Sequence, residues 1–333
     1  MPTLSLRDAE HLIAQALMRC RTSEANAASV ARALVAAEAD GLKGHGLSRV
    51  ASYASQAKVG KVDGNATPAV EQRRPGAAMI DAKNGFAYPA LDAAVALLPA
   101  LARQNGIASV GIRRSHHCGA AGHPVERLAE RGLLALMFAN TPAAMAPWGG
   151  TTAVFGTNPI AFACPLPGRA PVVVDLALSK IARGNILAAK QKGERIPEGW
   201  ALDASGTPTT DPDAALGGTM VPLGDAKGTA LALMVELVAA GLTGANYAAE
   251  ASSFLDAEGP PPGTGQLIIT LDPAAFGGTA ERFGALIAAI ETQAGARVPG
   301  SRRLALRRKA AREGLVVSDA LLNEIALLSD ANS

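Results

Sequence analysis

The amino-acid sequence predicts an α/β fold, and three observations carry this prediction. Short apolar runs typical of β-strands alternate with longer segments whose apolar residues recur at the helical spacing. Hydrophobic residues make up 49% of the 333 residues, which is enough for a large buried core. Only 4% of the residues are aromatic while about a fifth are alanine, and this composition favours closely packed helices.

Two helices are predicted at the N-terminus, over residues 5–20 and 24–40, because apolar residues recur there every three or four positions. Three glycines interrupt this pattern within residues 41–49. A third helix is predicted over residues 47–58, and it ends at Gly60.

From about residue 77 the pattern changes to strands that alternate with helices. Strands are predicted over residues 78–81, 107–112, 133–140, 160–164, 172–176 and 266–271. Helices are predicted over residues 88–104, 123–131, 226–243 and 279–294, and again from residue 302 onward. This mixture indicates an α/β body and leaves the order of the strands open.

Composition and charge exclude several classes of protein. The formal net charge of +2 and the absence of basic runs argue against a nucleic-acid partner. We expect no secretory signal and no membrane span, because the N-terminus lacks a basic-then-apolar pattern and the apolar stretches are short. Cys20, Cys118 and Cys164 are too widely spaced for a disulfide framework or a zinc site, so we expect free thiols in the cytoplasm and no bound metal.

Several familiar signatures are missing from the sequence. We find no G-x-G-x-x-G after a strand, no G-x-x-x-x-G-K-[ST], no H-E-x-x-H and no G-x-S-x-G. The sequence therefore gives no support to a standard Rossmann domain, a P-loop, a zinc protease or a hydrolase nucleophile elbow.

Residues 43–49 form the first candidate for chemistry. His45 lies between Gly44 and Gly46, so its imidazole can reach a ligand and exchange a proton near neutral pH. Arg49 follows four residues later and would share a helical face with His45, where its guanidinium suits a carboxylate. The alternative is a histidine that caps a turn beside an arginine in a surface ion pair.

A second candidate is residues 113–119, which follow a predicted strand and contain His116 and His117. Adjacent histidines point in different directions, so we do not expect them to hold one metal ion. The alternative is that one imidazole is packed and the other hydrogen-bonds the backbone.

Four further short segments carry polar or cationic groups beside glycines or strand ends. The turn with Thr157 could offer donors to an anion, and the helix start near Lys227 could hold a phosphate. The others are residues 175–180 at a strand end and residues 299–303, a compact cation site suited to an adenosine phosphate. Ordinary turns and surface ion pairs remain the alternative for these segments.

Seven segments, taken in order, resemble the type-2 malate/L-lactate dehydrogenase family over nearly the whole chain. They read GHGLSR, SHHCGAAGH, NTPAAMAPWGG, FGTNPIAFA, VVDLALSKIARG, PLGDAKG and LTGAN. The resemblance implies a non-Rossmann α/β fold with a mixed sheet and a helical domain built from both termini. It divides the chain into a helical domain of residues 1–75 and 300–333 and an α/β NAD(P)-binding domain of residues 76–299.

The resemblance also implies NADPH or NADH as cofactor and a homodimer with its active sites near the subunit interface. It assigns His45 as proton donor and acceptor, and Arg49 and Thr157, together with Lys43 and Ser48, as substrate contacts. The implied cofactor contacts are His116, His117, Asp175, Leu176, Ala177, Ser179, Lys180, Ala226, Lys227, Gly300, Ser301, Arg302 and Arg303.

Two positions depart from the pattern of the family. Gly44 stands where the family commonly has serine, and Asn185 stands where the cyclic-imine reductases have an aspartate partner of the histidine. Asn185 can orient the imidazole of His45 by a hydrogen bond but cannot stabilise its protonated form by charge. This departure disfavours imine reduction.

The predicted function is hydride transfer between a nicotinamide and C2 of a small anionic 2-oxo or 2-hydroxy acid of the malate, lactate or sulfolactate type. Reduction of Δ1-pyrroline-2-carboxylate or Δ1-piperideine-2-carboxylate is the alternative within the family. Arg302 and Arg303 favour NADPH, since a 2′-phosphate needs a cationic site. A cofactor-binding protein without turnover and a purely structural interaction protein are the alternatives from other classes.

Overall fold

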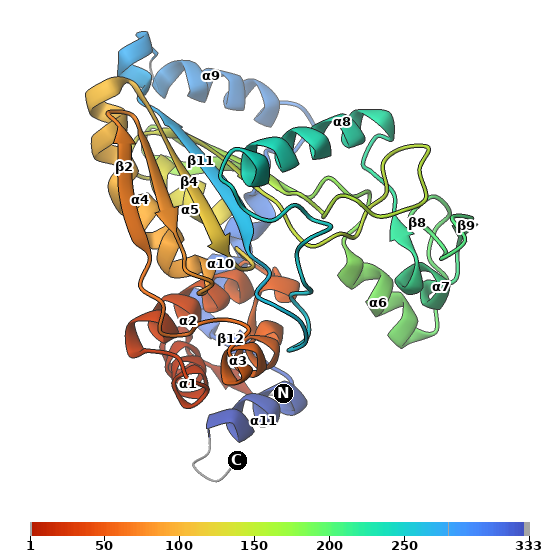
Figure 1. Cartoon of the computed structure of the whole chain (residues 1–333). Coiled ribbons are helices and arrows are strands. Elements are labelled where there is room, and N and C mark those ends of the chain that lie inside the picture. Colours follow the sequence, from red (N-terminus) through yellow and green to blue (C-terminus); the bar gives the residue numbers. More distant parts are fainter. Residues whose placement is uncertain (1, 279, 330–333) are drawn as a thin grey trace.

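A seven-stranded mixed sheet forms the centre of the molecule (Figure 1). The computed structural model describes residues 2–278 and 280–329. The strand order is β2 (Ala69–Arg74), β3 (Ala77–Asp81), β4 (Ile107–Ser115), β11 (Thr264–Leu271), β5 (Leu134–Ala139), β6 (Ile160–Leu166) and β7 (Arg169–Leu176). The strands β3 and β4 run parallel, and all other neighbours in this sheet run antiparallel.

Helices cover both faces of this sheet. On the central strand β11, Ile268 aligns with Val110 and Met137, and these side chains belong to a core formed with α4 (Ala87–Asn105) and α5 (Gly122–Ala129). The neighbouring Leu267 points to the opposite face because side chains alternate along a strand. There it packs in a second core with α8 (Ala226–Val235), while α9 (Ala280–Glu291) lies beside β6.

A helical layer from both ends of the chain lies below the sheet (Figure 1). It contains α1 (Leu6–Arg19), α2 (Glu24–Ala39), α3 (Val50–Val59), α10 (Ser301–Glu313) and α11 (Asp319–Ser329). Ser5 and Ser23 begin α1 and α2 by accepting hydrogen bonds from backbone N–H groups of the first turn. The two ends also pair directly, because β1 (Thr3–Leu4) runs antiparallel to β12 (Leu315–Val316).

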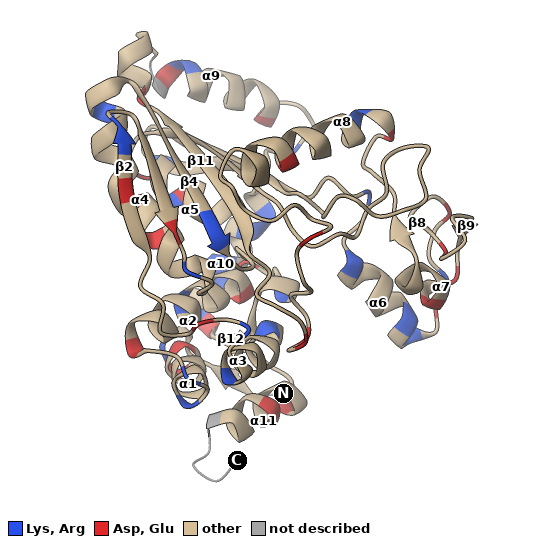
Figure 2. Ribbon diagram, viewed as in Figure 1, with Lys and Arg blue, Asp and Glu red and all other residues tan. Residues whose placement is uncertain are grey.

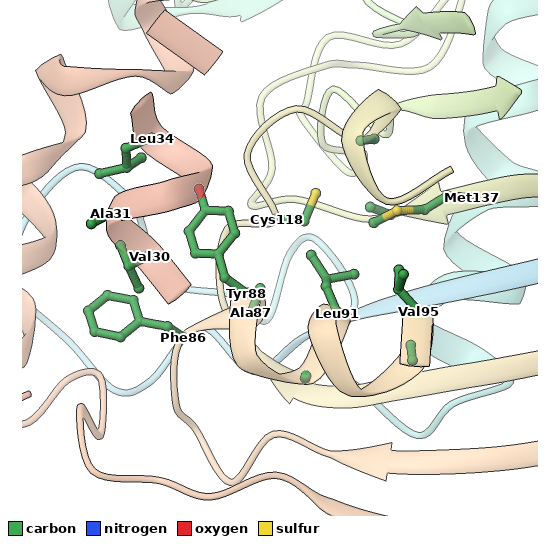
Figure 3. Packing of buried hydrophobic residues seen from close by; sticks show 14 of the residues in the cluster. Val30, Ala31, Leu34, Phe86, Ala87, Tyr88, Leu91, Val95, Cys118 and Met137 are labelled. Atoms are coloured by element: carbon green, nitrogen blue, oxygen red, sulfur yellow. The ribbon is translucent and has the colours of Figure 1, made fainter. Parts of the chain in front are cut away.

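The main core joins the helical layer to the sheet. Figure 3 shows Val30, Ala31 and Leu34 of α2 facing Phe86 and Tyr88 at the start of α4. Alanines dominate the buried face of α2, which lets helices approach closely, as the alanine-rich composition predicts.

A buried ion cluster fastens α10 to α2 and α5. Asp40, directly after α2, accepts hydrogen bonds from Arg307 at 2.7 Å and from Arg303 at 3.0 Å. Glu126 of α5 accepts two bonds from Arg303 and one from Arg307, all at 2.8 Å. His123 adds a bond to Asp40 at 2.9 Å. These contacts hold the pKa values of Asp40 and Glu126 below their usual range against the opposing effect of burial.

The predicted α/β class is confirmed, and the predicted strands and most of the predicted helices occur with small shifts at their ends. The single helix predicted from residue 302 onward is instead two helices, α10 and α11, separated by the short strand β12. Residue 279 of the predicted helix 279–294 and residues 330–333 of the predicted C-terminal helix lie outside the described residues. Within the predicted helix 226–243, the α-helix gives way at Glu236 to a π-helix over Glu236–Gly241. The carboxylate of Glu236 is buried there and accepts hydrogen bonds from Asn158, Asn140 and the backbone of Ala248.

The sequence did not predict the edge strand β2 or a small lobe inserted between β7 and α8. Every residue of β2 is exposed, so its sequence shows no alternation. The lobe comprises α6 (Arg183–Lys192), β8 (Ala201–Leu202), β9 (Pro208–Thr209), α7 (Pro212–Gly217) and β10 (Thr219–Met220). Its strands are too short for a period, and α6 buries only Ile186.

The division at residue 75 stays a prediction. Because β2 belongs to the central sheet, we place the boundary of the helical part before residue 69. None of the described helices combines the length and hydropathy needed to cross a membrane.

We expect Asp40→Asn to lower the free energy of unfolding by about 2–4 kcal/mol, because it removes the buried carboxylate that pairs with the partly buried Arg303 and Arg307. The matched control is Glu313→Gln, which removes an exposed pair with Lys309 and should cost under about 0.5 kcal/mol. Urea unfolding of both variants measures the difference. Equal destabilisation of the two would show that the cluster does not fasten α10.

Candidate active site

The segment that carries His45 consists of two 3-10 turns, Lys43–His45 and Leu47–Arg49, between α2 and α3. Glu38, a buried residue of α2, organises both turns. Its carboxylate accepts the backbone N–H of Leu47 at 3.0 Å and pairs with Lys43 at 3.1 Å. A Cβ on Gly46 would lie 2.2 Å from Oε2 of Glu38 and 3.1 Å from its Cα, so any larger residue here would displace the Glu38 side chain.

Arg49 folds back on the same segment. Its Nε donates to the carbonyl of Gly44 at 2.6 Å, while its terminal amino groups make no hydrogen bond or ion pair within residues 2–278 and 280–329. Ser48 donates to the carbonyl of Lys43 at 2.7 Å. The free end of the Arg49 fork is therefore available to an anion, whereas Lys43 and Ser48 are engaged in shaping the segment.

His45 is held in a neutral state. Its ring stacks on that of His117, with centroids 5.2 Å apart, and its Nδ1 is buried without a hydrogen-bond partner in the described part of the chain. Burial lowers the pKa of His45 to about 4, and the positive charges of Arg49 and His123 act in the same direction. At neutral pH and without a bound anion, the imidazole is therefore unprotonated.

His116 and His117 follow β4 and bind two side chains of α3. Nε2 of His116 lies 2.9 Å from Oε1 of Gln56, and Nδ1 of His117 lies 2.5 Å from the hydroxyl of Tyr53. The ring of Phe254 lies 5.1 and 5.2 Å from the two imidazoles. Burial lowers the pKa of His116 to about 3 and that of His117 well below its usual value. Both histidines therefore bond side chains, and neither takes the predicted bond to the backbone.

Asp175, at the end of β7, lies against the start of α5. Its Oδ2 accepts the backbone N–H of Gly122 at 2.7 Å, and a Cβ on Gly122 would lie 3.1 Å from the carboxylate. Burial raises the pKa of Asp175, and the bond from Gly122 opposes this shift. Gly300, with φ +87°, approaches the backbone of Val173 on the same strand. The predicted cofactor segments around residues 116–122, 175 and 300 are therefore neighbours.

The remaining predicted segments join this group through backbone bonds. The N–H of Leu178 donates to the carbonyl of Thr157 at 2.7 Å, and that of Leu223 donates to Leu178 at 2.7 Å. The N–H of Lys180 donates to Val221 at 2.8 Å. Residues 176–180 thus lie between the Thr157 turn and the segment that leads to Ala226 and Lys227 at the start of α8.

The two arginines of the PGSRR turn differ. Arg303 is committed to Glu126 and Asp40 in the ion cluster. Arg302 is exposed and forms no ion pair with any residue that the structure describes. Of the predicted cationic pair, only Arg302 offers a free guanidinium, with Ser301 exposed beside it.

Asn185 lies apart from the histidine that it was predicted to orient. It is exposed in the first turn of α6, in the inserted lobe, and within the described chain it makes no hydrogen bond to His45. Figure 1 shows α6 away from the α2–α3 connection.

Sequence reasoning missed Glu38, Tyr53, Gln56 and Phe254. Tyr53 follows Arg49 by four residues and Gln56 follows Tyr53 by three, so the helical spacing after the GHGLSR segment was the available signal. Phe254 lies in an irregular loop, so no helical spacing in the sequence pointed to it. Among the described residues, no group of three or more His, Cys, Asp or Glu side chains could hold a metal ion, and the three cysteines are free and buried.

The chain matches a known protein family over nearly its whole length. Residues 4–326 match the malate/L-lactate dehydrogenase family. The chain is 51% identical over 323 residues to the (2R)-3-sulfolactate dehydrogenase (NADP(+)) of Chromohalobacter salexigens, covering 97% of this chain and 96% of the relative. It is 38% identical over 335 residues to the Δ1-pyrroline-2-carboxylate reductase of Ancylobacter novellus, covering 99% and 98%.

Solved structures give the same result. The Δ1-piperideine-2-carboxylate reductase of Pseudomonas syringae superimposes with a TM-score of 0.94 at 39% identity, covering 98% of this chain and all of that one (100%). The sulfolactate dehydrogenase of Methanocaldococcus jannaschii superimposes with a TM-score of 0.90 at 30% identity, covering 98% and 96%.

The fold and the gathered segments define an oxidoreductase. The chain belongs to the malate/L-lactate dehydrogenase family. The predicted family and its non-Rossmann α/β fold are confirmed.

We expect Gly46→Ala to lower the free energy of unfolding by about 1–3 kcal/mol, because its Cβ forces Glu38 away from Leu47. Gly44→Ala is the matched control, since a Cβ there meets nothing within 4 Å, and its effect should stay under about 0.5 kcal/mol. Chemical denaturation compares the two variants. A Gly46→Ala protein as stable as the parent would contradict the close approach to Glu38.

Proposed function

We propose that the chain transfers a hydride reversibly between NADP(H) and C2 of a small anionic 2-oxo or 2-hydroxy acid, with His45 as the proton donor and acceptor. The observation that carries this proposal is a neutral imidazole next to an arginine whose guanidinium end is free. A 3-sulfolactate-type acid ranks first among malate, lactate and sulfolactate, because the relative from Chromohalobacter salexigens bears that name.

Arg49, Thr157 and His45 have separate roles in this reaction. The free end of Arg49 binds the substrate carboxylate as a fork, and Thr157 adds a hydroxyl contact. In the oxidation direction, neutral His45 accepts the proton of the 2-hydroxyl group. A bound anion beside His45 favours its protonated form, which raises its pKa and prepares it to return that proton in the reduction direction.

The residues at the cofactor segments fit a dinucleotide phosphate. The backbone of Gly122 lies close to Asp175, where a Cβ would be 3.1 Å from the carboxylate, and Gly300 takes a positive φ of +87° two residues before the unpaired Arg302. We assign Arg302 and Ser301 to the 2′-phosphate and residues 175–180 with residues 226–227 to the rest of the cofactor. The bound nicotinamide supplies or accepts the hydride. The NADP(+) in the name of the Chromohalobacter relative supports this assignment.

Cyclic-imine reduction is the second candidate, and the observation in its favour is the TM-score of 0.94 with a Δ1-piperideine-2-carboxylate reductase. Asn185 is exposed and lies away from His45. This weighs against Asn185 acting, within one chain, as the partner that the histidine has in the cyclic-imine reductases.

We also propose that the chain forms a homodimer through α8 and works in the cytoplasm. Leu231, Met234 and Leu237 are spaced by three along α8 and its π-helical extension, and they are 41%, 37% and 52% exposed. Leu233 and Leu242 extend this apolar surface. Between Lys227 in the first turn of α8 and Glu236, Figure 2 shows no charged residue. An apolar surface of this kind is typical of a contact between subunits, and a second copy of the chain fits it.

We expect NADPH oxidation to be fastest with 3-sulfopyruvate in a panel with oxaloacetate, pyruvate and the two cyclic imines. His45→Gln should lower kcat by about 100- to 10,000-fold, because the proton donor is lost. His11→Gln, on the surface of α1, is the control and should keep full activity. Full turnover by His45→Gln would exclude His45 as the acid, and a preference for an imine would select the second candidate.

We expect Arg302→Ala to raise KM for NADPH by about 10- to 100-fold, the loss of one charge-assisted contact, and to leave KM for NADH within about 3-fold. Arg308→Ala, also exposed on α10, is the matched control. Steady-state kinetics with both cofactors measures the effect. Equal changes in the two KM values would contradict the 2′-phosphate role.

We expect the chain to sediment as a dimer and Leu237→Asp to sediment as a monomer, because a buried carboxylate without a partner opposes association. Leu286→Asp, on the exposed face of α9, serves as the control and should leave the dimer intact. Analytical ultracentrifugation reports the mass, and a parent protein with the mass of one chain would contradict the dimer.

A further inference from the structure

One helix, α3, controls the two adjacent histidines that follow β4. Tyr53 and Gln56 are three residues apart and so lie on one face of α3. Tyr53 bonds His117, and Gln56 bonds His116. Both α3 residues are fully buried, so these contacts form in a space without bulk solvent.

The bond to Gln56 fixes the proton of His116. The amide Nε2 of Gln56 donates to the carbonyl of Phe254 at 2.9 Å, so its Oε1 faces the histidine. An amide oxygen only accepts hydrogen bonds, hence His116 carries its proton on Nε2 and donates it to Gln56. The proton of His116 is therefore used inside the protein and is not available to a substrate.

His117 is bonded differently, through two tyrosine hydroxyls in series. The hydroxyl of Tyr88 lies 3.2 Å from that of Tyr53, which lies 2.5 Å from Nδ1 of His117. Figure 3 shows Tyr88 between α2 and Cys118. Burial raises the pKa of Tyr53 to about 12 and that of Tyr88 well above its usual value, so both hydroxyls keep their protons at neutral pH.

The direction of this chain of hydrogen bonds follows from counting protons. If Tyr88 donates to Tyr53 and Tyr53 donates to His117, each hydroxyl proton has an acceptor. In the opposite direction, Nδ1 of His117 donates to Tyr53, and Tyr53 donates to Tyr88. The proton of the buried Tyr88 hydroxyl would then have no acceptor in the described part of the chain, which costs about 1–3 kcal/mol for a buried donor. The first direction is the favoured one.

We propose that Tyr53, backed by Tyr88, is a positioning residue that fixes His117 with its proton on Nε2, and that this N–H donates a hydrogen bond to the substrate beside His45. Nε2 of His117 has no partner in the described chain and, unlike Nδ1 of His45, is not enclosed. The stacked rings of His117 and His45, 5.2 Å apart, place the two imidazoles against the same ligand.

This role rests on the proposed function and deepens it. Hydride addition at C2 of a 2-oxo acid builds negative charge on the carbonyl oxygen. His45 supplies the proton to that oxygen, and the fixed N–H of His117 stabilises the charge before the proton arrives. His117 stays neutral throughout because its proton is only shared, so the proton balance of the reaction is carried by His45 alone.

The first test reads the tautomer directly and needs no turnover. The chain has five histidines, so protein labelled with 15N-histidine gives five ring systems, and the His117→Asn variant identifies the signals of His117. We expect the two-bond 15N–1H spectrum of the parent at pH 7 to show His117 protonated on Nε2. A proton on Nδ1, or an imidazolium, would overturn the proposal.

The second test removes the hydroxyl of Tyr53. Tyr53→Phe should move the Nδ1 resonance of His117 to that of an unbonded nitrogen and lower kcat about 10- to 100-fold, with KM for NADPH within about 2-fold. Tyr247→Phe is the matched control. Tyr247 is 41% exposed and takes no part in the bonds to His117, so this variant should leave the Nδ1 signal in place and change kcat by less than about 3-fold.

An unchanged kcat in Tyr53→Phe, with the Nδ1 signal shifted, would overturn the positioning role. If no acid or imine is reduced by the parent, the proposed function fails, while the parent spectrum still decides the tautomer. If Tyr53→Phe does not fold, the parent spectrum decides, because a proton on Nδ1 of His117 would overturn the proposal.

Discussion

The ion cluster of Asp40, Glu126, Arg303 and Arg307 is the constraint on which the site depends. Asp40 directly follows α2 and stands five residues before His45, while Arg303 lies in the first turn of α10, shortly after Gly300, which approaches Val173 of β7. The same bonds therefore fix the start of the segment that carries His45 and the position of α10. Buried charges are stable only with complete pairing, so the cluster admits one arrangement of these elements.

The active site lies at the junction that the cluster fixes. Elements of the helical layer supply His45, Arg49 and Tyr53, and elements of the sheet supply His117 and Asp175. Burial keeps the histidines neutral in the absence of a ligand. In such a space an anion that enters meets Arg49 with little competition from water, which strengthens their attraction.

Periodicity was enough to predict the helices and strands with a buried face. The glycine-flanked motifs indicated candidate segments, and the structure brings those around Gly122, Asp175 and Gly300 together. The exposed strand β2 carries no apolar pattern and could not be found in this way. Arg303 pairs with Glu126, a residue 177 positions away in the sequence. The sequence therefore shows that Arg302 and Arg303 are adjacent, but it does not show which of them is free. In the sequence, nothing distinguishes Tyr53 from an ordinary core residue, because only the structure shows its hydrogen bond to His117.

Gly44 has a consequence for how this family can diversify. Its carbonyl is held by Arg49, yet the space beside its Cα is empty, while Gly46 two positions later is enclosed. A side chain can therefore be added beside the proposed catalytic histidine without a steric clash, so substitution at this one position changes the surroundings of His45 while the scaffold stays constant.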